Sequence, residues 1–521
     1  MSKGVIIGGG HNGLVAACYL AKAGHQIEVF EARQLVGGAA VTEEFHPGFR
    51  NSTASYTVSL LHPKVQSDLN LQNHGLEIIE RPISNLLPLP DGRYLTLHPD
   101  IETSQASIGQ FSKADAQNLP RYYKDLDEVV PVVRWVMEQT PPNISHSGLA
   151  DIFKAIQLGG QFRKLSEQAR ARLLKLFTLS AAEFLSEYFE SAELKALFGF
   201  DAVVGHFDSP YSPGSAYVLL HHVVGGVNGK SGTWGHAVGG MGAITEAMAK
   251  EAEQLGVTIH VNSAVSQVLV DRGRASGIRL KDGQEVHSDF VVSNCNPQLL
   301  MTQLLPKTSV PADVAKHFQH YKNRSGTFRL NVALSQLPQF LCRPEPDALS
   351  GGIILAPSLD YMEAAFMTAK QQGFAARPIV EMLIPSTLDD SLAPPGKHVA
   401  SLFCQHFSPD LGAAWTEHKD AAINAIFAVV ESYAPGFKDS ILATQAHSPF
   451  DLEEKFGLSG GDIFHGRLSL DQLYSARPMS GMAQYKSHIH NLFLCGSGTH
   501  PGGGVSGIPG MNAAREIIRA L

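Results

Sequence analysis

The sequence has few cysteines, and no two of them are closely spaced. Its five cysteines among 521 residues form no C-x-x-C or C-x4-C pair: Cys18, Cys295, Cys342, Cys404 and Cys495. The spacing therefore predicts neither a redox disulfide nor a zinc cage, and no other combination of residues reads as a metal site. This use of cysteine favours a reducing compartment, either cytoplasm or an organelle matrix.

Long hydrophobic runs are also missing. No stretch approaches the roughly 18 apolar residues that a membrane-spanning helix requires. The first residues, "MSKGVII", lead directly into an expected strand, which leaves no room for the charged and apolar regions of a secretory signal. We therefore expect a protein that is soluble or peripheral to a membrane.

Charge of either sign is modest. Lysine and arginine number 41 and aspartate and glutamate 49, so the net charge is −8, with 17% charged and 44% hydrophobic residues. This balance gives no reason to expect nucleic acid as a partner. The composition is that of a compact globular protein, and the length predicts two to four lobes. It does not predict the oligomeric state.

Glycine is abundant, and the first cluster lies in a βαβ context. In "GVIIGGGHNGLVAACYLAKAGHQIEVFEA" a short apolar strand, a G-x-G-x-x-G turn, a helix ending near Gly24 and a second strand follow one another. Gly8 permits the tight turn, Gly10 lets backbone approach a pyrophosphate, and Gly13 lets helix and strand pack closely. Glu31, at the end of the second strand, is expected to bind ribose hydroxyls and to repel a 2′-phosphate, while Arg33 leaves some room for one.

A second cluster, "GSGTHPGGGVSGIPG" at 496–510, repeats the glycine spacing at the other end of the chain. No second strand or acidic ribose ligand can follow it, so it cannot be a complete βαβ unit. We interpret it as bare backbone laid against a large flat ligand, followed by a final helix that begins after Pro509 and whose N-terminus favours negative charge.

Several segments resemble known flavoenzymes. "EARQLVGGAA" after the second strand resembles the fingerprint of FAD-binding amine oxidases and phytoene desaturases, and "LCGSGTHPGGGVSGIPGMNAAREI" resembles their C-terminal flavin-contacting segment. Residues 48–63, parts of 209–270, and 447–478 resemble a branch of this phytoene-desaturase-like family named after pyridine nucleotide-disulfide oxidoreductases, although no redox disulfide is spelled here. The resemblance implies non-covalent FAD held by Gly8, Gly10, Asn12, Gly13, Glu31, Ala32, Arg33, Gly38, Gly240, Met241, Val265, Gly496, Gly503, Gly504 and Val505.

The expected fold class is α/β, with a Rossmann-like FAD-binding lobe of the glutathione-reductase and amine-oxidase type assembled from discontinuous segments, plus a mixed α+β substrate lobe. We assign 1–70, 235–300 and 485–521 to the FAD lobe, including a β-meander in 256–297. Residues 71–234 are expected to form a mainly helical cap in which prolines such as Pro131 break the helices. Residues 301–484 are expected to mix strands and helices.

The resemblance implies an FAD-dependent dehydrogenase or desaturase that takes hydride from an apolar isoprenoid-like or amine-bearing small molecule, with oxygen or a quinone as electron acceptor. A flavin-dependent isomerase and a flavin-stabilised interaction protein remain alternatives. His465, His500 and Tyr56 lie in the segments that resemble flavin-facing loops, and each is a candidate proton acceptor or donor. A packed side chain is the competing interpretation for each.

The stretch 152–176 carries six basic residues against Glu167 alone, interleaved with apolar residues. Such a pattern is typical of a helix that lies on an anionic membrane. A solvated helical face above a core stripe is the interpretation that we favour, and Gly159 and Gly160 are expected to interrupt the helix.

Overall fold

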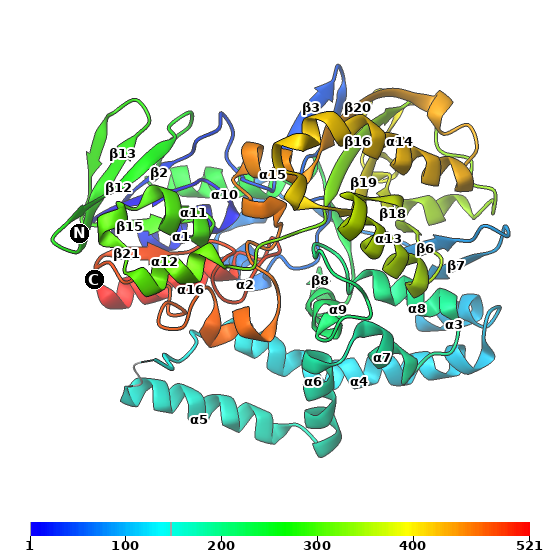
Figure 1. Ribbon diagram of the computed structural model, residues 1–521, viewed down its shortest axis with the longest axis horizontal. Coiled ribbons are helices and arrows are strands. Elements are labelled where there is room, and N and C mark those ends of the chain that lie inside the picture. Colours follow the sequence, from blue (N-terminus) through cyan, green and yellow to red (C-terminus); the bar gives the residue numbers. More distant parts are fainter. Residues whose placement is uncertain (1, 146–147) are drawn as a thin grey trace.

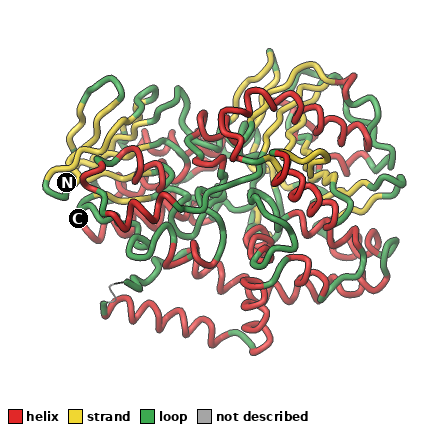
Figure 2. Tube along the Cα trace, in the orientation of Figure 1, coloured by secondary structure: helices red, strands yellow, loops and turns green. Residues whose placement is uncertain are grey.

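The computed structural model describes residues 2–145 and 148–521, which form two lobes with a helical region beside them. Strands gather in two groups, and the helices of the cyan segment lie below them (Figures 1 and 2). The first residues and the last helix belong to the same lobe, so the chain leaves this lobe and returns to it. Within the described residues, no helix is long and apolar enough to cross a bilayer.

The first lobe is built on a parallel sheet with the order β11-β2-β1-β15-β21. Its strands come from three distant parts of the sequence: β1 (Lys3–Ile7), β2 (Gln26–Phe30), β11 (Thr258–His260), β15 (Phe290–Ser293) and β21 (Leu492–Leu494). The middle strand β1 pairs in register with β2 through Lys3↔Gln26 and with β15 through Gly4↔Phe290. The Rossmann-like lobe is therefore assembled from discontinuous segments, as expected from the sequence.

The two faces of this sheet carry different layers, because successive strand residues point to opposite sides. Ile6 faces a helical layer, whereas Val5 and Ile7 face a three-stranded meander and further helices. The helical layer is α1 (His11–Lys22), α10 (Gly242–Gln254) and α16 (Ile508–Ala520); the meander is β12 (Val265–Asp271), β13 (Arg274–Leu280) and β14 (Glu285–His287). Helix α16 includes Pro509 in its first turn, where the missing N–H costs nothing, so the expectation that the helix begins after this proline was wrong.

The second lobe is a seven-stranded sheet with the order β20-β16-β19-β18-β17-β6-β7. The strands are β6 (Asn85–Pro88), β7 (Tyr94–Leu97), β16 (Phe328–Leu334), β17 (Gly352–Leu355), β18 (Phe374–Leu383), β19 (His398–Phe407) and β20 (Ile441–His447). Helix α14 (Trp415–Tyr433) packs on one face of this sheet through Trp415 and Ile426. The other face, with Ile379 and Phe403, packs against α13 (Leu359–Gln372) and the helical region.

The helical region spans α3 (Ile101–Ile108), α4 (Lys113–Met137), α5 (Leu149–Lys164), α6 (Glu167–Thr178), α7 (Ala181–Ser186), α8 (Ala192–Phe200) and α9 (Ser215–Val223). Pro131 does not break it, because α4 continues through both Pro120 and Pro131. The apolar face of α4, including Leu126 and Val129, is buried in the core and offsets the lost backbone hydrogen bonds. Helix α5 likewise continues through Gly159 and Gly160, because glycine lowers helix stability without removing a hydrogen bond.

Two segments join neighbours other than those predicted. Strands β6 and β7 fall in the stretch expected to be a helical cap, yet they extend the second sheet, where β6 pairs in parallel with β17. Helix α12 (Ala312–Gln319) follows the expected boundary at 300 but packs Val314 and Phe318 into the first lobe, as the preceding segment with α11 (Pro297–Leu299) was expected to do. The remaining elements are short: β3 (Thr42–His46), β4 (Phe49–Ser52), β5 (Ile78–Glu80), β8 (Gly226–Val227), β9 (Lys230–Ser231), β10 (Gly235–Ala237), α2 (Pro63–Asp68) and α15 (Pro449–Phe456).

Candidate functional site

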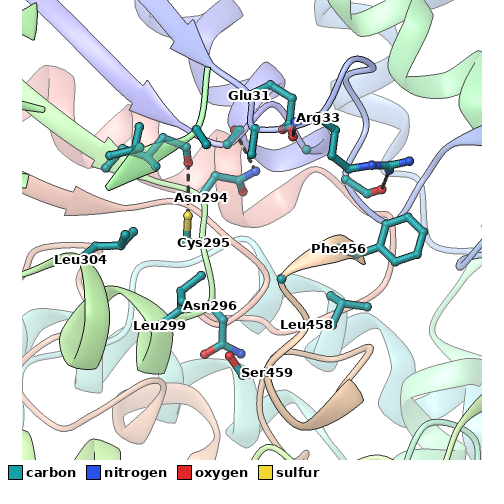
Figure 3. Close-up of a pocket in the computed structure, with 18 of the residues that line it drawn as sticks. Glu31, Arg33, Asn294, Cys295, Asn296, Leu299, Leu304, Phe456, Leu458 and Ser459 are labelled. Atoms are coloured by element: carbon teal, nitrogen blue, oxygen red, sulfur yellow. Dashed lines mark hydrogen bonds between the residues drawn. The ribbon is translucent and has the colours of Figure 1, made fainter. Parts of the chain in front are cut away.

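A cleft of about 640 Å³ opens at the carboxyl ends of β1, β2 and β15. Open α/β sheets bind their ligands at this edge, where loops from neighbouring strands diverge. Gly8 and Gly10 follow β1, Glu31 follows β2, and Asn294 follows β15. Figure 3 shows Glu31 and Arg33 together at one end of the cleft, with Phe456, Leu458 and Ser459 on a separate segment that closes one side.

The glycines of the first cluster make a turn with little room for side chains. Gly8 has φ +95°, and a Cβ on Gly13 would lie 2.3 Å from the carbonyl oxygen of Gly8. A Cβ on Gly38 would lie 3.2 Å from the Cα of Gly10, so the turn that contains Gly38 is in direct contact with the turn that contains Gly10. Gly10 is also the N-cap of α1. The result is a helix N-terminus with bare backbone around it, which suits a pyrophosphate.

Glu31 is fixed at the end of β2 by two backbone amides. Its Oε2 accepts a hydrogen bond from the N–H of Gly9 at 2.8 Å, and its Oε1 accepts one from Arg33 at 2.9 Å. Arg33 turns its guanidinium to Glu43 at 2.8 Å and stacks on Phe456. The charge of Arg33 is therefore already paired, which favours a ribose without a 2′-phosphate beside Glu31. Ala32 and Val265 line the same end of the cleft.

The second glycine cluster packs against the first. Asn12 Nδ2 donates to the hydroxyl of Ser497 at 3.0 Å, which joins α1 to the C-terminal loop. A Cβ on Gly496 would lie 2.5 Å from the carbonyl oxygen of Asn294, and one on Gly503 would lie 2.6 Å from the Cα of Phe464. Gly496 and Gly503 therefore allow close contact between segments and do not themselves line the cleft, whereas Ser497 does.

A smaller chamber of about 130 Å³ adjoins the cleft. Four residues line both hollows: His11, Ala39, His465 and Ser497. The chamber is enclosed by aromatic rings and by several ionisable groups: Tyr56, Arg81, Phe200, Asp201, His222, Trp234, Glu381 and Phe464. Met241, Gly504 and Val505 of the predicted cofactor set also line this chamber, while Gly240 lies behind it in a turn beside the hydroxyl of Thr42.

Tyr56 brings its hydroxyl into this chamber. The hydroxyl donates to Glu381 Oε2 at 2.5 Å, the ring stacks on Phe403, and the guanidinium of Arg329 lies 4.4 Å from the ring centre. Burial raises the pKa of Tyr56 well above its ordinary value, and the negative charge of Glu381 adds to this. Burial also raises the pKa of Glu381, although the hydrogen bond from Tyr56 opposes that change. Tyr56 is consequently a proton donor held on a buried carboxyl group.

His465 lies where the cleft and the chamber meet. Its backbone is held at φ +56°, a conformation that non-glycine residues rarely adopt, and its Nδ1 has no hydrogen-bond partner among the described residues. Burial lowers the pKa of His465 to about 3, and the positive charge of Arg477 adds to this. At neutral pH His465 is therefore an uncharged imidazole with a proton-accepting nitrogen.

Arg477 holds the segment that carries His465. Its buried guanidinium donates to backbone carbonyls on two segments, the 464–472 loop and the C-terminal glycine loop. The bonds to Phe464 and Ser497 measure 2.6 and 2.9 Å. One side chain thus fixes His465 beside Ser497.

His500, the third candidate, lies elsewhere. Its Nε2 is 2.9 Å from the carbonyl oxygen of Val136, and its ring meets Tyr474 edge-on. It lines neither the cleft nor the chamber. Within the described part of the chain, His500 is a buried side chain that ties the glycine loop to α4.

A third hollow, of about 750 Å³, adjoins the chamber on the side of α2 and α4. It shares Ser59 and Leu60 with the chamber. A Cβ on Gly504 would lie 2.4 Å from Leu60 Cδ1, so Leu60 packs directly onto the glycine loop. This hollow is the candidate approach to the chamber, and Leu60 stands between the two.

Several lining residues were not predicted from the sequence. Asn294 and Asn296 follow β15 in "VVSNCNP", and their position after a buried apolar strand was the available signal. Arg81, Asp201 and Glu381 carried no comparable signal, because they come from three separate segments that meet only in the folded chain.

The cleft fits a dinucleotide. The bare glycine backbone and the N-terminus of α1 suit a pyrophosphate, and the carboxylate of Glu31 suits a ribose. Three polar atoms on its lining residues are buried without a partner in the described chain: His11 Nε2, Asn296 Nδ2 and His465 Nδ1. Buried polar atoms are normally hydrogen-bonded, so these three are atoms that a bound polar ligand would satisfy.

Comparison with known proteins identifies this ligand. The sequence profile of flavin-containing amine oxidoreductases matches residues 13–518. The chain belongs to this family. Amine oxidoreductases of this family contain a flavin, and the chain is therefore an FAD-dependent oxidoreductase of phytoene-desaturase-like type. We propose the cleft as the site of this FAD.

Relatives of this oxidoreductase cover its whole length. Mouse pyridine nucleotide-disulfide oxidoreductase domain-containing protein 2 is 40% identical, with 99% of this chain and 93% of the mouse protein aligned. A lycopene-forming phytoene desaturase from Pseudescherichia vulneris is 27% identical over 100% of this chain and 99% of its own. The crystal structure of an oxidoreductase from Methanosarcina mazei superimposes with a TM-score of 0.62 at 16% identity, over 99% and 100% of the two chains, and confirms the fold.

Proposed function

We propose that this flavin-containing oxidoreductase dehydrogenates a small molecule held in the chamber lined by Tyr56 and His465. The observation that supports this assignment is the junction between the chamber and the FAD cleft, where His11, Ala39, His465 and Ser497 line both. A flavin held at this junction by the glycine turn and Glu31 would supply the acceptor for a hydride from a substrate C–H bond. The remaining tasks belong to the residues of the chain.

These residues exclude water and hold protons. Phe200, Trp234 and Phe464 form apolar walls of the chamber. His465, uncharged at neutral pH, is suited to accept a proton released as the substrate is oxidised. Tyr56 donates its hydroxyl hydrogen to Glu381, so the hydroxyl oxygen is left to accept a hydrogen bond from the substrate. His500 has no comparable access, so we assign it no proton-transfer role.

The size and polarity of the chamber favour one of the two expected substrate classes. Pockets for drug-sized ligands measure about 300–1,000 Å³, and this chamber measures about 130 Å³. A long isoprenoid exceeds that volume, whereas a small polar molecule fits among Arg81, Asp201 and Glu381. We therefore propose a small polar substrate. Oxygen or a quinone, reaching the site through the hollow beside Leu60, is the proposed electron acceptor.

The test is anaerobic titration of the FAD-loaded protein with small amines and with isoprenoids while the flavin absorbance band is recorded. Bleaching by a small polar compound supports the proposal, and Phe substitution at Tyr56 and Ala substitution at His465 should then slow the bleaching. Bleaching by a long isoprenoid alone would contradict the small-substrate assignment. A flavin that dithionite reduces, but none of these compounds does, would shift the assignment to the isomerase alternative.

We also propose peripheral membrane contact through 152–176. Helix α5, at the outer edge of the molecule in Figure 1, has no buried residue. Leu149, Ile152, Phe153 and Ile156 follow one helical face and are 88, 51, 60 and 65% exposed. Basic residues on α5 and α6 supply charge for an anionic lipid surface.

Vesicle sedimentation tests this contact. We expect phosphatidylglycerol vesicles to retain the protein, and the substitution Ile156→Glu to weaken retention by about tenfold, since a charge on the apolar face cannot be buried in lipid. Glu substitution at Leu442, an exposed leucine of the second sheet, is the matched control. Equal retention on phosphatidylcholine vesicles, or none on either, would contradict the proposal.

A further inference from the structure

Arg81 places a guanidinium in the wall of the chamber. The residue follows β5 and is only 6% exposed. Its backbone N–H donates to Trp234 at 3.1 Å, and its Nη2 donates to the hydroxyl of Thr57. Those contacts fix the orientation of the side chain. In the described part of the chain no carboxylate forms an ion pair with this guanidinium, although the charge of Glu381 favours the protonated form of Arg81.

The carboxyl groups near Arg81 are otherwise engaged or uncharged. Glu381 accepts the hydrogen bond of Tyr56 and also faces the guanidinium of Arg329 behind the Tyr56 ring. Burial raises the pKa of Asp201 to about 8, with a contribution from the charge of Glu381, so Asp201 is mostly protonated near pH 7. Two guanidinium groups thus surround one carboxylate.

The other titratable groups of the chamber do not change this balance. Burial lowers the pKa of the three lining imidazoles to about 4 or below, so they are uncharged near pH 7: His11, His222 and His465. Tyr56 keeps its proton. The chamber therefore carries an excess of positive charge near pH 7, and Arg81 is the cation on its lining.

Buried charges in proteins are paired or are completed by a ligand, because an isolated one is costly. We propose that Arg81 binds a carboxylate group of the substrate, so that the molecule oxidised in the chamber is a small carboxylic acid or a derivative that keeps this group. The inference rests on the proposed dehydrogenation and adds a substrate class to it. The planar guanidinium pairs with a carboxylate through two parallel hydrogen bonds, which suits a fixed orientation toward His465.

Binding of three matched aromatic probes to the FAD-loaded protein tests this subsite. Benzoate, benzamide and benzylamine have a similar ring but carry a negative, a neutral and a positive group. Each is titrated at pH 7 while the visible flavin spectrum is followed, because a ligand in the adjoining chamber shifts that spectrum. We expect benzoate to bind about tenfold or more tightly than benzamide and benzylamine, which corresponds to one charge-assisted pair.

Two substitutions assign the effect to the side chain. Arg81→Met should weaken benzoate by about tenfold or more and leave benzamide unchanged, and Arg81→Lys should recover part of the affinity, since it restores the charge without the planar fork. Arg93→Met is the matched control, because Arg93 is an exposed arginine paired with Asp91. It should leave all three affinities unchanged.

The outcomes separate this proposal from the proposed function. Equal binding of benzoate and benzamide to the wild-type protein overturns the carboxylate subsite even where Arg81→Met does not fold. Preferred binding of benzylamine overturns it in favour of a cationic ligand. If benzoate binds as expected but no carboxylate or amine reduces the flavin, the subsite stands and the dehydrogenase assignment fails.

Discussion

The proposed FAD cleft and the proposed substrate chamber meet at His465, yet the cleft is lined mainly by backbone and the chamber mainly by side chains. The cleft is mostly backbone: Gly8, Gly10 and Gly38 expose amides and carbonyls, and Glu31 is the main charged group at its ribose end. The chamber is mostly side chain: Tyr56, Arg81 and Glu381 arrive from separate segments and hold one another in place. A backbone site leaves a motif in the sequence, and a side-chain site of this kind does not.

The largest expected effect concerns the backbone site. Gly13→Val places side-chain atoms against Gly8, where even a Cβ would lie 2.3 Å from the carbonyl oxygen. We expect a loss of about 3 kcal/mol in the free energy of unfolding from overpacking, plus the stabilisation that bound FAD contributes. Urea unfolding and the flavin absorbance of the purified protein measure both. Gly159→Ala, at an open helical position, should instead be neutral or stabilise by up to about 1 kcal/mol.

A yellow Gly13→Val protein with the flavin content of the wild type would show that the close contact is not required.

The second effect tests the side chain that joins the two sites. Arg477→Leu leaves several buried carbonyls without a donor, including those of Phe464 and Ser497. The expected cost is about 3 kcal/mol in unfolding free energy, since each orphaned buried group costs about 1–3 kcal/mol. Thermal unfolding of the FAD-loaded protein measures this loss. Arg93→Leu, at an exposed arginine, should change stability by less than about 0.5 kcal/mol.

If Arg477→Leu unfolds at the wild-type temperature, the hydrogen bonds of Arg477 contribute nothing to the stability of the fold.

The third prediction uses pH to probe the chamber. The pKa of Asp201 is raised to about 8 in the folded chain from 3.8. Between these values the unfolded chain releases a proton that the folded chain keeps, so this group lowers stability as pH rises from about 4 to about 8. Asp201→Asn removes that term. The stability of the variant relative to the wild type should therefore grow by about 2 kcal/mol between pH 6 and pH 8.

Urea unfolding at several pH values measures this difference. Asp347→Asn, in a surface turn of the second lobe, serves as the control and should show no such trend. A constant offset between wild type and Asp201→Asn across the range would mean that Asp201 is ionised in the folded chain.

The smallest effect concerns the ribose end of the cleft. Glu31→Gln keeps the shape of the side chain but removes its charge and one acceptor, whose partners are the amides of Gly9 and Arg33. We expect FAD affinity to fall by about tenfold, or about 1.4 kcal/mol, while the benzoate affinity of the FAD-saturated protein stays unchanged. Fluorescence titration of the apoprotein measures the first. A loss of benzoate affinity would show that the two sites are coupled.

The sequence predicted the part of the molecule built from consecutive backbone segments and missed the parts where distant segments meet. The βαβ unit, its three glycines and Glu31 were predicted because strand, turn and helix are consecutive in the chain. Residues 85–97 were expected in a helical cap, but they form β6 and β7, since the strand that β6 pairs with, β17, lies more than 250 residues further along. Pro131 was expected to break a helix, and burial of α4 overrode that local preference.

The sequence by itself determined the nucleotide-binding lobe and the family, because close backbone approach requires glycine at fixed spacing and so marks the chain. Only the tertiary structure decided what lies beside the cofactor. It separated His465, at the junction, from His500, hydrogen-bonded to Val136. It also brought Arg81, Asp201 and Glu381 around one small chamber, and the charge that this chamber carries depends on burial, which no local pattern of residues specifies.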